Sequence, residues 1–155
     1  MTPREIALKV AWSFLGKPYL WGGDDPMAGF DCSGFVIECL KSAGRLPRTG
    51  DWTANGLYEK FKVVIIPYEA CLVFWENNGR IVHVELCIDD IYSIGFSGGG
   101  SDTLTVQDAI KQNAYCKVGP YRSRAGLYGF VDPFLHLSNV WTDEEPARPL
   151  RLLGI

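Results

Sequence analysis

The sequence contains no long apolar run, and this excludes one large class of protein. No window approaches the ~18 consecutive apolar residues that indicate a transmembrane helix, so we expect no membrane span. Residues 1–16 mix Arg4, Glu5 and Lys9 with apolar positions and carry no small-residue cleavage site, unlike a signal peptide. We therefore expect the protein to be synthesised in the cytoplasm without a signal peptide.

Positive charge is also not in excess, which argues against nucleic acid as a partner. The chain has 15 Lys and Arg against 18 Asp and Glu, and the basic residues are scattered rather than gathered in a stripe. Its 5 cysteines are an odd number and follow no metal-ligand spacing, so we expect no metal and no other cofactor. Most of these thiols are interpreted as buried core residues, namely Cys39, Cys71, Cys87 and Cys116.

The length and composition predict a single folded domain followed by a tail. A chain of 155 residues with 47% hydrophobic content buries about two-thirds of its unfolded surface. After Phe134 the sequence becomes polar and is interrupted by Pro146 and Pro149. We predict one domain over residues 1–136 and a polar tail over residues 137–155, which lies over the surface or docks on a partner.

The spacing of apolar residues predicts helices first and an antiparallel meander of strands after them. Helices are expected from a Thr2 cap to about Leu15, from Cys32 to near Gly44, over residues 53–61, and from a Thr105 cap through Ile110. Strands are expected over residues 63–66, 71–75, 80–88, 91–96, 115–121 and 127–131, with turns at 77–79 and 89–90. This order is typical of an α+β fold.

Cys32 stands out among the thiols because it lies at the start of a predicted helix. Unpaired amides and the helix dipole at that position favour a thiolate over a thiol. Its neighbours Asp31, Ser33 and Gly34 are polar or small, which is unusual for a buried core cysteine, the alternative interpretation.

A thiolate nucleophile needs a base within hydrogen-bond reach, and the chain has only 2 histidines. His83 lies in a predicted strand, on the face opposite to the apolar face formed by Val82, Val84 and Leu86. An ordinary strand histidine is the alternative interpretation of His83. His136 follows an apolar stretch near the tail, and we assign it no role.

Two motifs around Cys32 resemble the opening signature of NlpC-type papain-like cell-wall cysteine peptidases. Weaker similarities lie just after the cysteine helix, at the start of the His83 strand and at the end of the domain. The resemblance therefore spans about residues 6–134. The two motifs are Gly16-Lys17-Pro18-Tyr19-Leu20-Trp21-Gly22-Gly23 and Gly29-Phe30-Asp31-Cys32-Ser33-Gly34-Phe35-Val36, and the similarity that closes the domain is Gly129-Phe130-Val131-Asp132-Pro133-Phe134.

The resemblance implies a papain-like α+β fold in which a helix with the nucleophile packs on a central antiparallel sheet. It implies Cys32 as nucleophile, His83 as base, and the Tyr19 hydroxyl with the Cys32 amide as oxyanion donors. Asp31 and Ser33 would line a pocket for the amine or stem peptide of the substrate. The implied reaction is hydrolysis of D-γ-glutamyl-type bonds in peptidoglycan stem peptides.

The chain departs from the family pattern near the base. The polar residue that orients the histidine should follow it by about twelve positions, where this chain has Gly95. Glu85 stands where relatives have a small residue, and we expect its carboxylate on the same strand face as His83, about 7 Å away. A backbone carbonyl, a water molecule, Ser93, Ser97 or Glu85 are the candidate substitutes.

Two hypotheses about function follow, and a third concerns the substrate. The first is a peptidoglycan hydrolase that reaches the wall as a phage lytic or tail-associated enzyme or as a secreted effector, with a phage tail or a secretion system as partner. The second is a degenerate member that binds stem peptides or assembles into a phage structure, which Gly95 favours. The third is acyl transfer to lipids or protein amides; for lipids we would expect a membrane-anchoring segment, which the sequence lacks.

Overall fold

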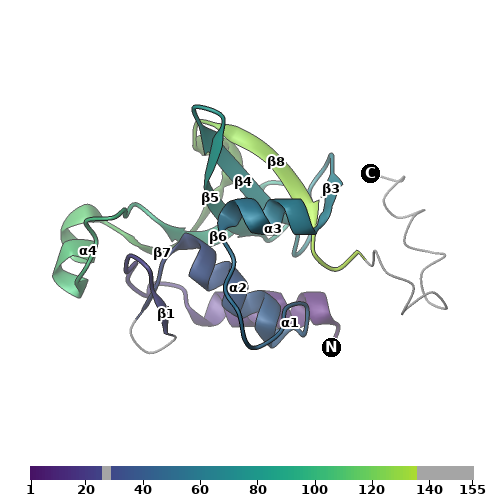
Figure 1. Ribbon diagram of the computed structural model, residues 1–155, viewed down its shortest axis with the longest axis horizontal. Coiled ribbons are helices and arrows are strands. Elements are labelled where there is room, and N and C mark those ends of the chain that lie inside the picture. Colours follow the sequence, from purple (N-terminus) through teal and green to yellow (C-terminus); the bar gives the residue numbers. More distant parts are fainter. Residues whose placement is uncertain (26–28, 136–155) are drawn as a thin grey trace.

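A six-stranded antiparallel sheet organises the fold. The computed structural model describes residues 1–25 and 29–135. The strands follow the order β3-β8-β4-β5-β6-β7, and helices pack against the sheet (Figure 1). The predicted α+β class is therefore confirmed. His136 and the predicted tail lie outside the described residues.

The helices begin where their capping residues predict. Thr2 forms a capping box with Glu5, Asp31 and Thr53 cap the next two helices, and Thr105 forms a capping box with Asp108. The helices are α1 Pro3–Ser13, α2 Cys32–Ser42, α3 Ala54–Lys60 and α4 Val106–Gln112, with a short 3-10 turn, η1 Tyr121–Ser123. Their ends differ from expectation by about two residues, since α1 and α2 stop before the predicted Leu15 and Gly44 and α4 continues past Ile110.

The strands match the predicted runs, but their order in the sheet is not a plain meander. They are β3 Lys62–Val64, β4 Leu72–Asn77, β5 Arg80–Cys87, β6 Tyr92–Ser97, β7 Tyr115–Pro120 and β8 Leu127–Asp132, with a small β1 Asp24–Asp25 and β2 Gly29–Phe30 ribbon before α2. Strands β4 to β7 are consecutive neighbours, whereas β8 returns to pair between β3 and β4. Asn78 and Gly79 both have positive φ, as the predicted tight hairpin requires.

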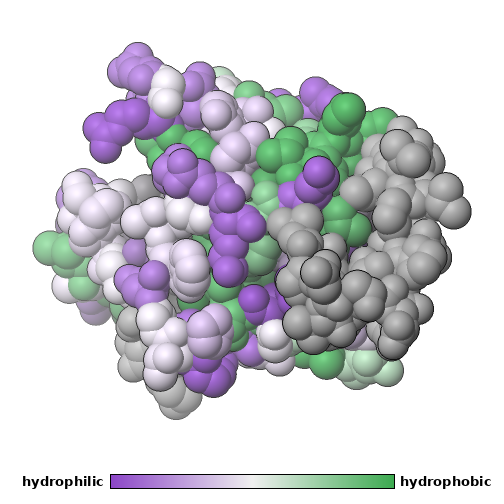
Figure 2. Space-filling view, turned by 45° about the vertical axis from the view of Figure 1, so that its right-hand side comes forward, coloured by the Kyte–Doolittle hydropathy of each residue, from purple (hydrophilic) through white to green (hydrophobic). Residues whose placement is uncertain are grey.

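The first predicted strand is shorter than expected. It ends at Val64, and Ile65 and Ile66 leave the sheet with 87% and 47% of their surface exposed. Apolar residues reach the surface elsewhere too, as one face of the molecule shows (Figure 2). An apolar run therefore predicted a strand correctly but overestimated its length.

Each face of the sheet has its own apolar core. Phe74, Val84 and Leu86 pack on one face with residues of α1, α2 and α3. The other face carries a smaller cluster that includes Val73 and Trp75. Both faces of β5 are thus covered, and this explains why His83 is buried although it does not share the face of Val84.

Strands β5 and β6 separate part of the way along their length. They are paired only at Leu86 with Ile94 and at Cys87 with Ser93, while β5 remains paired with β4 back to Arg80. Helix α2 contacts both strands. Its first residue, Cys32, lines one cavity together with Val82 and His83, which belong to the half of β5 that is not paired with β6.

None of the described helices is long and apolar enough to cross a membrane.

Candidate active site

One cavity collects the thiol, the imidazole and the phenol that the sequence singled out. Its volume is about 370 Å³. The lining residues are Tyr19, Trp21, Cys32, Val82, His83, Ser97, Gly98, Gly99, Gly100 and Arg124. Asp31 and Ser33 are not among them.

Cys32 is the first residue of α2, and the loop before it is clamped to the helix. The Asp31 carboxylate accepts hydrogen bonds from the amides of Gly34, at 2.8 Å, and Gly22, at 3.0 Å. A Cβ at Gly34 would lie 2.2 Å from the Gly23 carbonyl oxygen, so only glycine permits this close approach. The two motifs around the cysteine are therefore parts of one packed unit.

The environment of Cys32 favours a neutral thiol in the free protein. Burial, followed by the nearby Asp31 carboxylate, raises the pKa of the Cys32 thiol to about 11. The backbone amides of Val84 and Ser33 and the charge of Arg124 oppose this shift only in part. The position at the helix start was expected to favour the thiolate, but desolvation outweighs the backbone donors.

His83 is buried, and its ring is fixed on two sides. Its centroid lies 5.1 Å from that of Trp75, and its Nε2 lies 2.7 Å from Glu85 Oε2. Burial lowers the pKa of His83, Glu85 opposes that effect, and Arg124 adds to it. Because a carboxylate only accepts hydrogen bonds, the ring proton belongs on Nε2 and the lone pair on Nδ1.

Tyr19 is held between a strand edge and a glycine loop. Its amide donates to the Ala114 carbonyl at 3.0 Å, and a Cβ at Gly99 would lie 2.5 Å from the Tyr19 ring. Burial raises the pKa of Tyr19, and the proximity of Cys32 adds to the shift. The phenol therefore keeps its proton and remains a hydrogen-bond donor within the cavity.

Asp31 and Ser33, the pair predicted to bind the substrate amine, stabilise the start of α2 and do not line the cavity. Besides capping α2, the Asp31 carboxylate accepts a long hydrogen bond of 3.5 Å from Ser33 Oγ. Its role in binding a substrate amine stays a prediction.

Sequence reasoning missed two features of the cavity. One is the Gly98-Gly99-Gly100 loop, for which the glycine run itself was an available signal. The other is Arg124, whose Cζ lies 5.6 Å from the centroid of the Trp75 ring. Its position depends on a turn far along the chain, which no local pattern predicts. In the described part of the chain, no group of three or more His, Cys, Asp or Glu residues is arranged to hold a metal ion.

Comparison with known proteins identifies the relatives of this chain. The model of the NlpC/P60 family matches residues 16–119. The Gamma-D-glutamyl-L-lysine dipeptidyl-peptidase of Bacillus subtilis is 32% identical over 109 residues, which cover 68% of this chain and 36% of that protein. The Murein DD-endopeptidase MepH of Escherichia coli is 37% identical over 82 residues, covering 49% and 29%. The solved peptidoglycan hydrolase RipB of Mycobacterium tuberculosis superposes with a TM-score of 0.62 at 26% identity, covering 84% of this chain and 63% of that one. The chain thus spans about a third of the length of these two curated relatives.

Proposed function

Because this chain belongs to the NlpC/P60 family, we propose that it is a cysteine peptidase that hydrolyses an amide bond in peptidoglycan stem peptides. The observation that carries this proposal is the single cavity lined by Cys32, His83 and Tyr19. Acyl transfer through a thioester uses a thiol nucleophile, a base and a hydrogen-bond donor to the oxyanion, and the protonated Tyr19 phenol can be that donor.

The proposed reaction begins with both catalytic groups neutral. The Cys32 thiol gives its proton to His83 Nδ1 as the sulfur attacks the substrate carbonyl carbon. The resulting oxyanion receives hydrogen bonds from the Tyr19 hydroxyl and the Cys32 amide. His83 then protonates the leaving amine, the C–N bond breaks, and a thioester on Cys32 remains. Water, deprotonated by His83, hydrolyses the thioester and restores the thiol.

We propose a D-γ-glutamyl-type bond as the one that is cleaved. A γ-linked glutamyl residue keeps a free α-carboxylate, and Arg124 is the one formally charged side chain among the lining residues. No Asp or Glu lines the described cavity to repel such a group. The similarity to the dipeptidyl-peptidase of Bacillus subtilis supports the same choice.

The route to the wall is a separate proposal. We propose that the protein acts at the cell wall after lysis, virion delivery or secretion, with a phage tail or a secretion system as the carrier.

Substitution of the nucleophile tests the proposed function. Cys32→Ala and Cys32→Ser should each abolish the release of soluble peptides from purified peptidoglycan, with unchanged circular dichroism. Cys116→Ser is the matched control, because Cys116 is a fully buried thiol outside the cavity and should affect stability more than turnover. Full activity of either Cys32 variant would refute the assignment. Absence of turnover in the wild type, together with tight binding of stem peptides, would establish a peptidoglycan-binding module instead.

A further inference from the structure

We propose that Glu85 is the positioning residue of His83, and that it acts from β5 in the space that a side chain at residue 95 of β6 would otherwise occupy. The kinetic part of the proposal rests on the proposed function. The contact itself is a property of the free protein and can be tested without a substrate.

Both oxygens of the Glu85 carboxylate are engaged. Oε2 lies 2.7 Å from His83 Nε2, and Oε1 accepts a hydrogen bond of 2.7 Å from Ser93 Oγ. His83, Glu85 and Ser93 have exposed fractions of only 4%, 9% and 1%. The bond between Glu85 and His83 is therefore shielded from water. In such a shielded site a charge-assisted hydrogen bond orients its partner most strongly.

Strand register explains why Glu85 reaches this place. The last paired residues before the fork are Leu86 and Ile94, so continuation of the register sets Glu85 opposite Gly95. Opposite residues of antiparallel strands point to the same face. Side chains at positions 85 and 95 would therefore compete for one space beside the imidazole.

Gly95 is the complement that admits Glu85. A Cβ built at Gly95 would lie 2.4 Å from Glu85 Cγ and 3.0 Å from its Cβ and Cδ. These distances are too short for any side chain at residue 95 while Glu85 keeps its position. Because Gly95 has no side chain, it leaves the space that the Glu85 side chain of the neighbouring strand occupies.

The other candidate orienting groups do not make this contact. Ser93 donates to Glu85 rather than to the ring. Ser97 lines the cavity, but the described hydrogen bond of the His83 ring is the one to Glu85. The charged or titratable groups around the imidazole are Glu85 on β5, Arg124 after η1, and Cys32 and Tyr19 across the cavity. Of these, only the Glu85 carboxylate stabilises a positive ring, because Arg124 disfavours it.

Glu85→Gln tests the charge while keeping the shape. The expected kcat falls at least about tenfold, equal to ~1.4 kcal/mol in the barrier, with KM within about twofold. Because Glu85 raises the pKa of His83, its removal should move the acidic limb of the kcat profile to lower pH. Glu85→Asp should retain more activity than Glu85→Gln. Ser93→Ala, which keeps the His83 contact, is the matched control and should cost less than Glu85→Gln.

A reciprocal exchange tests the shared space. Gly95→His alone should lower activity, since the new ring meets Glu85. In the Glu85→Gly background, Gly95→His should raise activity at least tenfold above that of Glu85→Gly alone. No recovery in the double variant, with circular dichroism unchanged, would refute the exchange of positions.

A titration of His83 by NMR separates this proposal from the proposed function. The ring nitrogens are followed in a His136→Gln background, so that one imidazole remains. Glu85→Gln should lower the measured pKa of His83 and weaken its Nε2–H tautomer. An unchanged pKa and tautomer would refute the positioning role. A shift in a protein that hydrolyses no peptidoglycan would support the contact while the proposed function fails.

Discussion

The two residues proposed to react are both held in their neutral forms. Burial raises the pKa of the Cys32 thiol to about 11, and burial lowers the pKa of His83 below its ordinary value of 6.5. A preformed thiolate and imidazolium pair is therefore disfavoured in the free site. Proton transfer then accompanies attack on the substrate, and Glu85 stabilises the charge that appears on the ring.

This state predicts a broad pH profile for kcat/KM. Turnover needs an unprotonated His83, so activity should appear as pH rises through a value below 6.5. It should fall only as pH approaches about 11, where the thiol ionises without passing its proton to the ring. The two limbs belong to the coupled pair. Initial rates across the pH range check this, and a narrow bell with an alkaline limb between about pH 8 and 9 would contradict it.

Residue identity at the site was largely predictable, whereas the contacts were not. A cysteine after a helix cap and a histidine in a strand were recognised from local patterns, and both line one cavity. Strand periodicity also put Glu85 on the His83 face. The expected separation of about 7 Å between the carboxylate and His83 was wrong, since Glu85 Oε2 lies 2.7 Å from His83 Nε2. Residues i and i+2 of a strand are about 7 Å apart along the backbone, but their side chains are free to converge.

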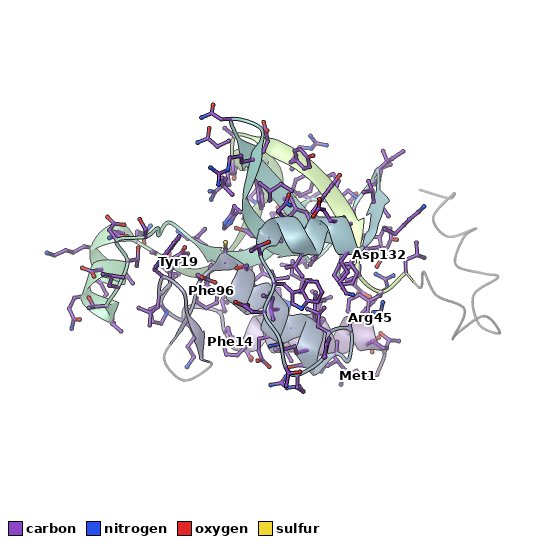
Figure 3. The ribbon with its side chains drawn as sticks, viewed as in Figure 1. Met1, Phe14, Tyr19, Arg45, Phe96 and Asp132 are labelled. Atoms are coloured by element: carbon purple, nitrogen blue, oxygen red, sulfur yellow. The ribbon has the colours of Figure 1, made fainter. Side chains whose placement is uncertain are left out.

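At the scale of elements, the glycine loop after β6 forms a wall that determines where Tyr19 lies. Gly99 packs against the Tyr19 ring. Gly98 has a φ of +93°, and a Cβ built on it would lie 2.8 Å from the Asn113 carbonyl oxygen. Figure 3 shows Tyr19 on the side of the molecule nearer to α4. The proposed oxyanion donor thus depends on a loop that brings no reactive side chain of its own.

Gly99→Ala should therefore impair catalysis through Tyr19. The added methyl group would lie 2.5 Å from the ring and displace the phenol. We expect kcat to fall about tenfold, or ~1.4 kcal/mol, with little change in thermal stability because the loop is at the cavity edge. Gly100→Ala is the matched control, since its Cβ would meet only Asp102 at 3.7 Å. Equal effects of the two changes in a peptidoglycan assay would refute the argument.

Helix starts and hairpins were predicted more accurately than the order of strands. A cap acts within one turn of its helix, so the Thr2 and Thr105 caps could be read directly from the sequence. The insertion of β8 between β3 and β4 depends on pairing across the whole domain, and neither strand encodes its neighbour locally. The fork between β5 and β6 was missed for the same reason.

At the scale of the whole molecule, a buried ion pair joins the first helix to the last strand. Arg4 Nη2 lies 2.6 Å from Asp132 Oδ2, and the two side chains are 7% and 0% exposed. Asp132 also accepts hydrogen bonds from the Tyr68 hydroxyl at 2.5 Å and the Phe134 amide at 2.8 Å. Figure 3 shows Asp132 at the end of the molecule that holds Met1, away from Tyr19. The closing motif of the family resemblance therefore fastens the two ends of the described domain.

Removal of one partner should destabilise the protein without disabling the site. Arg4→Met leaves a buried carboxylate without its cation, so we expect the free energy of unfolding to fall by about 3–5 kcal/mol in urea titrations. Arg48→Met is the control, because the Arg48 side chain that pairs with Glu38 is 66% exposed, and its loss should change the free energy of unfolding by less than about 1 kcal/mol. The double change Arg4→Met with Asp132→Leu should recover only part of the loss, since Tyr68 and Phe134 would still lose this acceptor. Below the unfolding transition, Arg4→Met should keep its kcat. If Arg4→Met lowers the free energy of unfolding as little as Arg48→Met does, the Arg4 to Asp132 pair does not stabilise the fold.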